Sequence, residues 1–145
     1  WQVNKSDNTD IPNIGIAGPT GATTTGSATQ LIDSSATFLT SGVKLNMIVV
    51  NTTDNTQAVV IGIEDDNTLT VSANIFAVSG KNYAIYGGDQ EGAVLYIGTA
   101  GNLKVTTVAG DDVTFQGVNT GTFFPVNVVK VFATGTSADN IIALW

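Results

Sequence analysis

The chain contains neither cysteine nor histidine. Without cysteine it forms no disulfide and offers no thiolate to a metal. Without histidine it lacks the base of Ser-His-Asp and Cys-His nucleophiles and the commonest transition-metal ligand. The catalytic arrangements that the composition leaves open are a pair of carboxylates and a Ser-Lys pair.

Positive charge is also scarce, since the chain holds five basic residues, all lysine, against twelve acidic ones. The formal net charge of −7 opposes binding to a phosphate backbone, so we expect no nucleic-acid partner. No apolar run approaches the roughly 18 residues of a membrane-spanning helix, so we expect no membrane insertion. The chain begins at Trp1 instead of Met, which we interpret as a sign of processing or of a preceding leader.

Apolar residues are plentiful, at 43% of 145 residues, and predict a folded chain of one domain or two small lobes. Short β-branched segments recur at about ten-residue spacing between polar turns, the pattern of a sandwich or barrel. We therefore expect an all-β fold, either a β-sandwich or a partly open barrel. The expected strands cover residues 45–51, 57–64, 68–72, 83–86, 93–97, 102–107, 112–116, 125–133 and 141–145.

Turn residues separate these segments. Residues 54–55, 65–67 and 110–112 combine Asp, Asn and Gly between apolar runs and predict hairpin connections. The expected helix content is a single short turn at residues 33–38, with Asp33 as its cap.

The polar, glycine-rich stretch at residues 87–92 is the best internal boundary. Residues 1–29 carry few large apolar groups and many Asn, Thr, Gly and Pro, which predicts an extended arm. The expected organisation is therefore an arm or linker at 1–29, a first β lobe at 30–88 and a second β lobe at 89–145.

Most acidic residues fall in the predicted turns, where solvated hairpin tips explain them. The alternative is a weak calcium site built from oxygen ligands of two turns, and we expect no other cofactor. An enzyme with two carboxylates, represented by Asp66 and Asp111, is the weakest interpretation. We expect no enzyme and no catalytic residues.

Five aromatic residues are available for a carbohydrate-binding platform: Trp1, Tyr83, Tyr86, Tyr96 and Trp145. Tyr83 and Tyr86 have opposite parity on one strand, and Tyr96 sits in an apolar run. Packing therefore explains them better, and a glycan partner stays an alternative.

The C-terminal third carries a resemblance. Residues 94–106 read VLYIGTAGNLKVT and residues 112–115 read DVTF. They are followed by GTFFPV at 121–126, VVKV at 128–131, ATGT at 133–136 and NIIALW at 140–145. Residues 93–145 resemble small β modules of tailed-phage virion proteins, and residues 28–33, 42–43, 47–51 and 83–86 resemble such modules more loosely.

The resemblance implies a virion location and a role in assembly. Such modules occur in spike bases, tail fibres and head-decoration proteins, where they oligomerise and contact other virion subunits without catalytic residues. We therefore expect a structural subunit that decorates a capsid or builds a tail spike or fibre. The candidate interface residues are Ile11, Ile14, Ile16, Phe123, Phe124, Phe132 and Trp145.

Two alternatives stay open. One is an extracellular or cell-surface filament subunit of pilus type, whose N-terminal arm completes the sheet of the next copy. The other is a carbohydrate-binding module. Removal of the arm would abolish polymerisation of the filament but leave a decoration protein folded and oligomeric.

Overall fold

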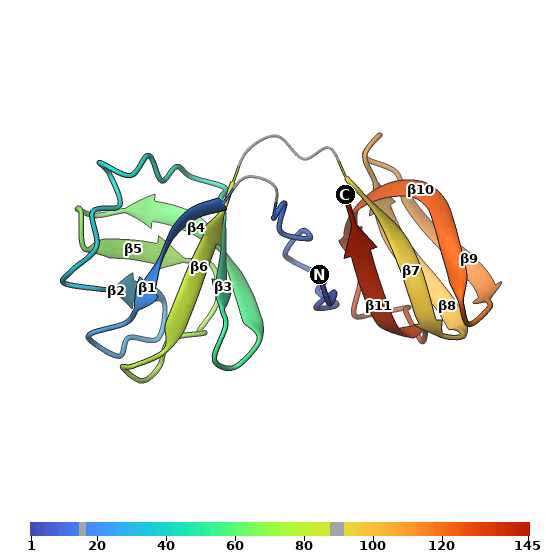
Figure 1. Ribbon diagram of the computed structural model, residues 1–145, viewed down its shortest axis with the longest axis horizontal. Helices are drawn as coiled ribbons and strands as arrows, with labels where there is room; N and C mark the ends of the chain where they lie inside the picture. The colour runs from blue at the N-terminus through green and yellow to red at the C-terminus, as the bar shows by residue number, and fades with distance from the viewer. Residues whose placement is uncertain (15–16, 88–91) are drawn as a thin grey trace. The chain divides into compact units, whose positions relative to one another are not determined.

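A computed structural model describes residues 1–14, 17–87 and 92–145 of the chain. None of these residues lies in a helix, so the described part contains no helix that could span a membrane. The regular structure is two open antiparallel sheets of six and five strands, one in each of two compact units (Figure 1). The predicted all-β class is confirmed.

The two units divide the chain unequally. One comprises Ile14–Gly88 and is called the inserted unit. The other is built from two separate stretches, Trp1–Asn13 and Asp89–Trp145, and is called the split unit. The predicted boundary residues 88–91 lie outside the described residues, as does Ile16.

The inserted unit holds the six-stranded sheet, with strand order β1-β6-β3-β4-β5-β2. Its strands are β1 (Ala17–Ala22), β2 (Gln30–Ile32), β3 (Ile48–Asn51), β4 (Thr56–Ile63), β5 (Thr68–Val71) and β6 (Asn82–Tyr86). Just after β1, Thr25 bridges Ile32 of β2, so the two edges of the sheet approach each other. The sheet thereby curls around a core that includes the fully buried rings of Phe38 and Phe76.

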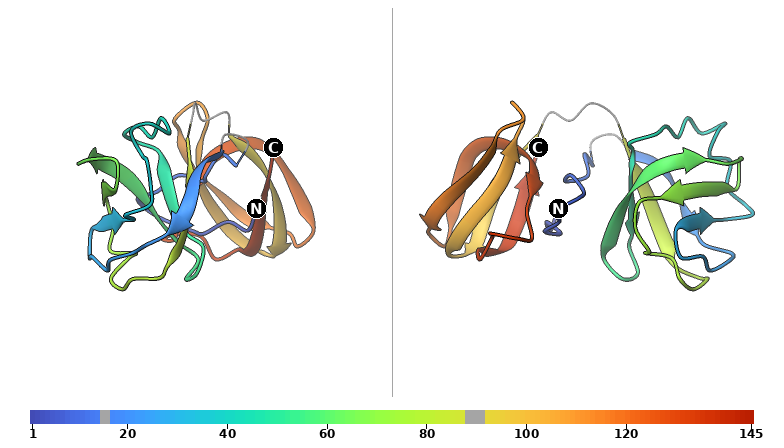
Figure 2. Two further views of the ribbon diagram at one scale, coloured as in Figure 1. Left: turned by 60° about the vertical axis from the view of Figure 1, so that its left-hand side comes forward. Right: turned by 180° about the vertical axis from the view of Figure 1, so that it is seen from behind.

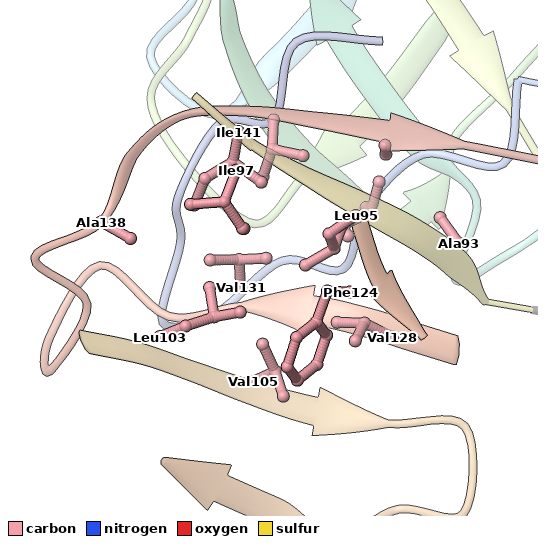
Figure 3. Close-up of a cluster of buried hydrophobic side chains, with 13 residues drawn as sticks. Ala93, Leu95, Ile97, Leu103, Val105, Phe124, Val128, Val131, Ala138 and Ile141 are labelled. Atoms are coloured by element: carbon pink, nitrogen blue, oxygen red, sulfur yellow. The ribbon is translucent and has the colours of Figure 1, made fainter. Parts of the chain in front are cut away.

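The split unit holds the five-stranded sheet, with strand order β11-β7-β10-β8-β9. Its strands are β7 (Ala93–Thr99), β8 (Gly101–Thr107), β9 (Asp112–Val118), β10 (Thr122–Val131) and β11 (Asp139–Leu144). Every second side chain of β7 and β8 points into one core, where Leu95, Ile97, Leu103 and Val105 are fully buried (Figure 3). In β8, the buried Leu103 and Val105 alternate with the half-buried Lys104 and Thr106.

The start of the chain pairs with its end. The backbone N–H of Val3 donates to the carbonyl of Ile141 at 2.9 Å, and the N–H of Ala143 donates to the carbonyl of Trp1 at 2.8 Å. The first residues therefore pair with the free edge of β11, and Figure 2 shows the two chain ends near each other.

The N-terminal segment then reaches β10. The N–H of Ser6 donates to the carbonyl of Val131 at 2.9 Å, and the N–H of Ile11 donates to that of Val129 at 2.7 Å. The side chain of Ile11 is only 3% exposed and belongs to the core of the split unit. Residues 1–13 are therefore a packed part of this unit.

The expectation of an extended arm over residues 1–29 is wrong. Residues 1–13 belong to the split unit, while residues 17–22 form β1 and pair with β6 in the inserted unit. The composition concealed β1, because this edge strand reads AGPTGA and pairs through its backbone, with no large side chain to bury. The inserted unit therefore begins at residue 14 and not at residue 30. The split unit combines residues 89–145 with residues 1–13.

The nine predicted strands are all present, with ends shifted by a few residues, and β1 and β2 were missed. The three predicted turns connect hairpins, and Asn55 adopts a φ of 55° that turn residues tolerate. Residues 33–38 form a hydrogen-bonded turn without a helix. Asp33 nevertheless acts as expected of a cap, since its Oδ1 accepts the N–H of Ser35 at 2.9 Å.

Candidate functional site

An apolar surface lies on the split unit where β7 pairs with β10 and β11. Phe123 of β10 lies beside Tyr96 of β7, and Tyr96 lies beside Ile142 of β11. In the adjacent row, Val94 of β7 lies beside Leu144 of β11. These five side chains and the neighbouring Trp145 are called the β7 face.

Strand alternation places these side chains on the outside. Phe124 points into the core and is 7% exposed, whereas its neighbour Phe123 is 65% exposed (Figure 3 labels Phe124 among the inward residues). Leu95 in β7 is likewise fully buried between the half-buried Val94 and Tyr96. Because the period of a strand is two, a sheet that fills its core with every second residue presents the others to solvent.

The aromatic rings of the β7 face contact each other. The ring centroids of Tyr96 and Phe123 are 5.3 Å apart, and the rings meet edge to face. This geometry is favourable for aromatic pairs and holds Phe123 in place although most of it is exposed.

A shallow hollow of about 250 Å³ lies at the end of the β7 face formed by Val94, Leu144 and Trp145. It is lined by Gly92, Val94, Asn127, Leu144 and Trp145. Leu144 is 41% exposed and Trp145 is 47% exposed, so both present apolar surface there. None of the described residues that form the β7 face or line this hollow is charged.

The seven predicted interface residues differ in how far they are exposed in the structure. Ile11 and Phe124 are buried in the core of their own unit and present no free surface, which corrects their assignment. Ile14 is 39% exposed, and Phe123 and Trp145 belong to the β7 face. Ile16 lies outside the described residues.

Phe132 is half-buried beneath two lysines. The Nζ atom of Lys104 lies 4.3 Å from the centroid of its ring, and that of Lys130 lies 5.6 Å away. These cation–π contacts occupy the ring within its own unit. Phe132 is therefore a weaker interface candidate than Phe123.

Sequence reasoning missed Val94, Tyr96, Ile142 and Leu144. The signal was present, because each lies one residue away from a buried side chain within an alternating strand. The sequence did not give the strand order. Only that order places β7 between β10 and β11, although about forty residues of chain separate β7 from β11.

Tyr83 packs inside its unit, as the sequence interpretation expected in preference to a carbohydrate-binding platform. Its side chain is 3% exposed and its hydroxyl donates to Oδ2 of Asp33 at 2.8 Å. Burial raises the pKa of the Tyr83 hydroxyl. The hydrogen bond to Asp33 and the negative charge of Asp33 raise this pKa further. Tyr86 is half-buried on the opposite parity of β6, as expected.

Acidic side chains of the turns accept hydrogen bonds from other parts of the protein. Oδ1 of Asp66 accepts the backbone N–H of Leu39 at 3.0 Å, and Oδ1 of Asp112 accepts the hydroxyl of Thr106 at 2.7 Å. Within residues 1–14, 17–87 and 92–145, no three or more acidic side chains gather in a way that could hold a metal ion. Asp89 and Glu91 lie outside these residues.

A scan against protein-family models, a search of curated proteins and a search of solved structures each found no match to this chain.

Proposed function

We propose that this chain is a non-enzymatic structural subunit of a virus particle and that its copies associate through the β7 face. The observation that carries the proposal is Phe123, a large apolar side chain that is 65% exposed and lies at one end of the row that it forms with Tyr96 and Ile142. Exposed contiguous apolar surface on a water-soluble unit is characteristic of interaction sites.

The chemistry of the β7 face favours a second copy as its partner. Every copy carries a formal net charge of −7, so two copies repel each other wherever their acidic residues approach. No side chain of the β7 face is charged, so its burial against an identical face leaves no charged side chain unpaired. A two-fold axis through the face would bring the same residues together from both copies.

The aromatic residues supply the energy that such a contact needs. A few large side chains near the centre of an interface usually carry most of the binding energy, and aromatic residues are enriched among them. Tyr96 and Phe123 are already packed edge to face in one copy, so little conformational freedom is lost when they are covered.

The pairing of the N-terminal segment supports closed association over a filament. Residues 1–3 hydrogen-bond with β11 of the same chain, and Ile11 fills the core of the same unit. A filament built by arm exchange requires this segment to leave that position for the next copy. The virion part of the proposal depends on the resemblance of residues 93–145 to phage virion modules.

Light scattering of the purified chain over a wide concentration range tests the association. We expect a discrete small oligomer for the natural chain, and at least tenfold weaker association for Phe123→Ser. The matched control is Leu39→Ser, which removes a side chain 55% exposed on the inserted unit and should leave the oligomer unchanged.

Four results would count against the proposal. A natural chain that stays monomeric at millimolar concentration would refute association through the β7 face, and so would an oligomer that survives Phe123→Ser. Long polymers that disappear on deletion of residues 1–13 would favour the filament. Immunogold electron microscopy of particles made from the genome that encodes the chain tests the location, and unlabelled particles would refute a virion role.

A further inference from the structure

The inserted unit contains a hollow of about 500 Å³ with a mixed polar and apolar lining from β1, the loop after β2 and Tyr83 of β6. This volume lies within the range of roughly 300–1,000 Å³ of small-molecule sites. Asp33 and Tyr83 line it with side chains that are 5% and 3% exposed, whereas Thr20 and Ser41 line it with exposed ones. The hollow therefore has a buried polar floor and a hydroxyl-bearing rim.

The carboxylate of Asp33 lies at the floor and can accept further hydrogen bonds. Oδ2 of Asp33 accepts the hydroxyl of Tyr83 at 2.8 Å, and Oδ1 accepts the backbone N–H of Ser35 at 2.9 Å. An ionised carboxylate accepts about four hydrogen bonds. Asp33 is thus positioned by two donors from the protein and retains lone pairs for donors of a ligand.

Gly21 in β1 lies directly against Oδ2 of Asp33 and the Tyr83 hydroxyl. A Cβ atom at position 21 would lie 2.6 Å from both Oδ2 of Asp33 and the Tyr83 hydroxyl. The φ angle of Gly21 is not in the left-handed region, so its backbone would accept a side chain. The glycine is therefore required for space beside the two polar atoms and not for the conformation of the strand.

We propose that this hollow binds a neutral saccharide. Adjacent sugar hydroxyls can donate to the free lone pairs of Asp33, and hydroxyls of Ser and Thr on the rim can both donate to and accept from them. Pro19 and Ala36 add apolar surface for the C–H face of a sugar ring. A ligand of many hydroxyls matches this mixture of a single carboxylate, hydroxyls and small apolar groups.

A cation fits the hollow less well. Asp33 is the one charged side chain among the described residues that line it, and calcium takes six to eight oxygen ligands with several carboxylates among them. The charge of Asp33 is also already stabilised by the Tyr83 hydroxyl and the Ser35 N–H. A neutral hydrogen-bond donor is therefore the better partner for its remaining lone pairs.

Nuclear magnetic resonance titration of the ¹⁵N-labelled full chain tests the proposal. The probes are neutral hexoses, 6-deoxyhexoses, N-acetylhexosamines and their disaccharides, each added singly, with calcium chloride as a separate probe. We expect saturable shifts at the amides of Gly21 and Ser35 with at least one saccharide and none with calcium.

Two matched variants locate the site. Ser35→Trp places a large ring in the hollow while retaining the backbone N–H that Asp33 accepts, and should weaken binding at least tenfold. Ser34→Trp is the control, because Ser34 is equally exposed and does not line the hollow. Asp33→Asn, checked for folding by its amide spectrum, should also weaken binding at least tenfold.

The proposal is refuted if no saccharide shifts these amides, if calcium alone shifts them, or if Ser35→Trp and Ser34→Trp bind alike. The inference does not depend on the association through the β7 face. Phe123→Ser should leave saccharide binding unchanged, so the two proposals can fail separately.

Discussion

The hydroxyl of Tyr83 in β6 donates to the carboxylate of Asp33 in the loop after β2, at 2.8 Å and across fifty residues of chain. Both side chains are buried, and this bond connects a strand of the sheet to the loop that carries Phe38 into the core. A buried pair of this kind makes stability sensitive to the loss of either partner.

Stability should fall at alkaline pH because of Tyr83. Its folded pKa is raised above the ordinary value of 10.0, so the unfolded chain releases the phenolic proton first as pH rises. The hydroxyl of Tyr83 makes its full contribution to the free energy of unfolding below pH 10. Above pH 10 this contribution falls by about 1.4 kcal/mol per pH unit for one such group.

Urea unfolding of the natural chain and of Tyr83→Phe, at pH 8 and at pH 10.5 to 11, measures this effect. Tyr83→Phe should lose about 1–3 kcal/mol at pH 8, because Asp33 loses a donor in a buried place. The gap between the two proteins should narrow as pH rises. A gap of constant size would show that Tyr83 titrates normally, and Tyr96→Phe serves as the control.

Substitution by Ala should lower the free energy of unfolding much more at Phe124 than at Phe123. Phe124→Ala removes a ring that packs edge to face on Phe115 within the core and should cost about 3–5 kcal/mol. Phe123→Ala removes an exposed ring and should change the unfolding free energy of dilute, dissociated protein by less than about 1 kcal/mol. A larger loss for Phe123→Ala than for Phe124→Ala would mean that the strand has the other register, and equal losses would contradict the separation of the two rings into core and surface.

Ile11 and Ile14 form a second matched pair. Ile11→Ala should destabilise the split unit by about 2–5 kcal/mol, because the side chain is 3% exposed in its core. Ile14→Ala should cost under about 0.5 kcal/mol, since Ile14 is 39% exposed. Thermal unfolding followed by circular dichroism distinguishes these results, and an unaffected Ile11→Ala would restore the interpretation of residues 1–13 as a free arm.

The two units should differ in their ability to fold as isolated fragments. Residues 14–88 contain every strand of the six-stranded sheet and its core, so this fragment should fold alone. Residues 89–145 lack Val3 and Ile11, two buried members of the other core, and should be much less stable unless a peptide of residues 1–13 is added. Amide dispersion in NMR spectra checks both fragments, and a fully stable 89–145 fragment would contradict the packing of the N-terminal segment.

The alternation of large β-branched and polar residues determined much of the fold from the sequence. The strands from β3 to β11 were predicted because each carries enough apolar residues to bury one face, and local turn residues marked their ends. β1 and β2 escaped because an edge strand of small residues, and a strand of three residues, bury too little to leave a pattern.

The sequence by itself determined the all-β class and the lack of imidazole and thiol chemistry, since these depend on residue type and on the two-residue period of a strand. Only the tertiary structure decided that residues 1–13 pair with β11 and β10, that Phe123, Tyr96 and Ile142 form one row, and that Gly21 leaves room beside Asp33 and Tyr83. Strand order and the closing of long loops depend on which distant segments bury most surface together, and no local pattern records that choice.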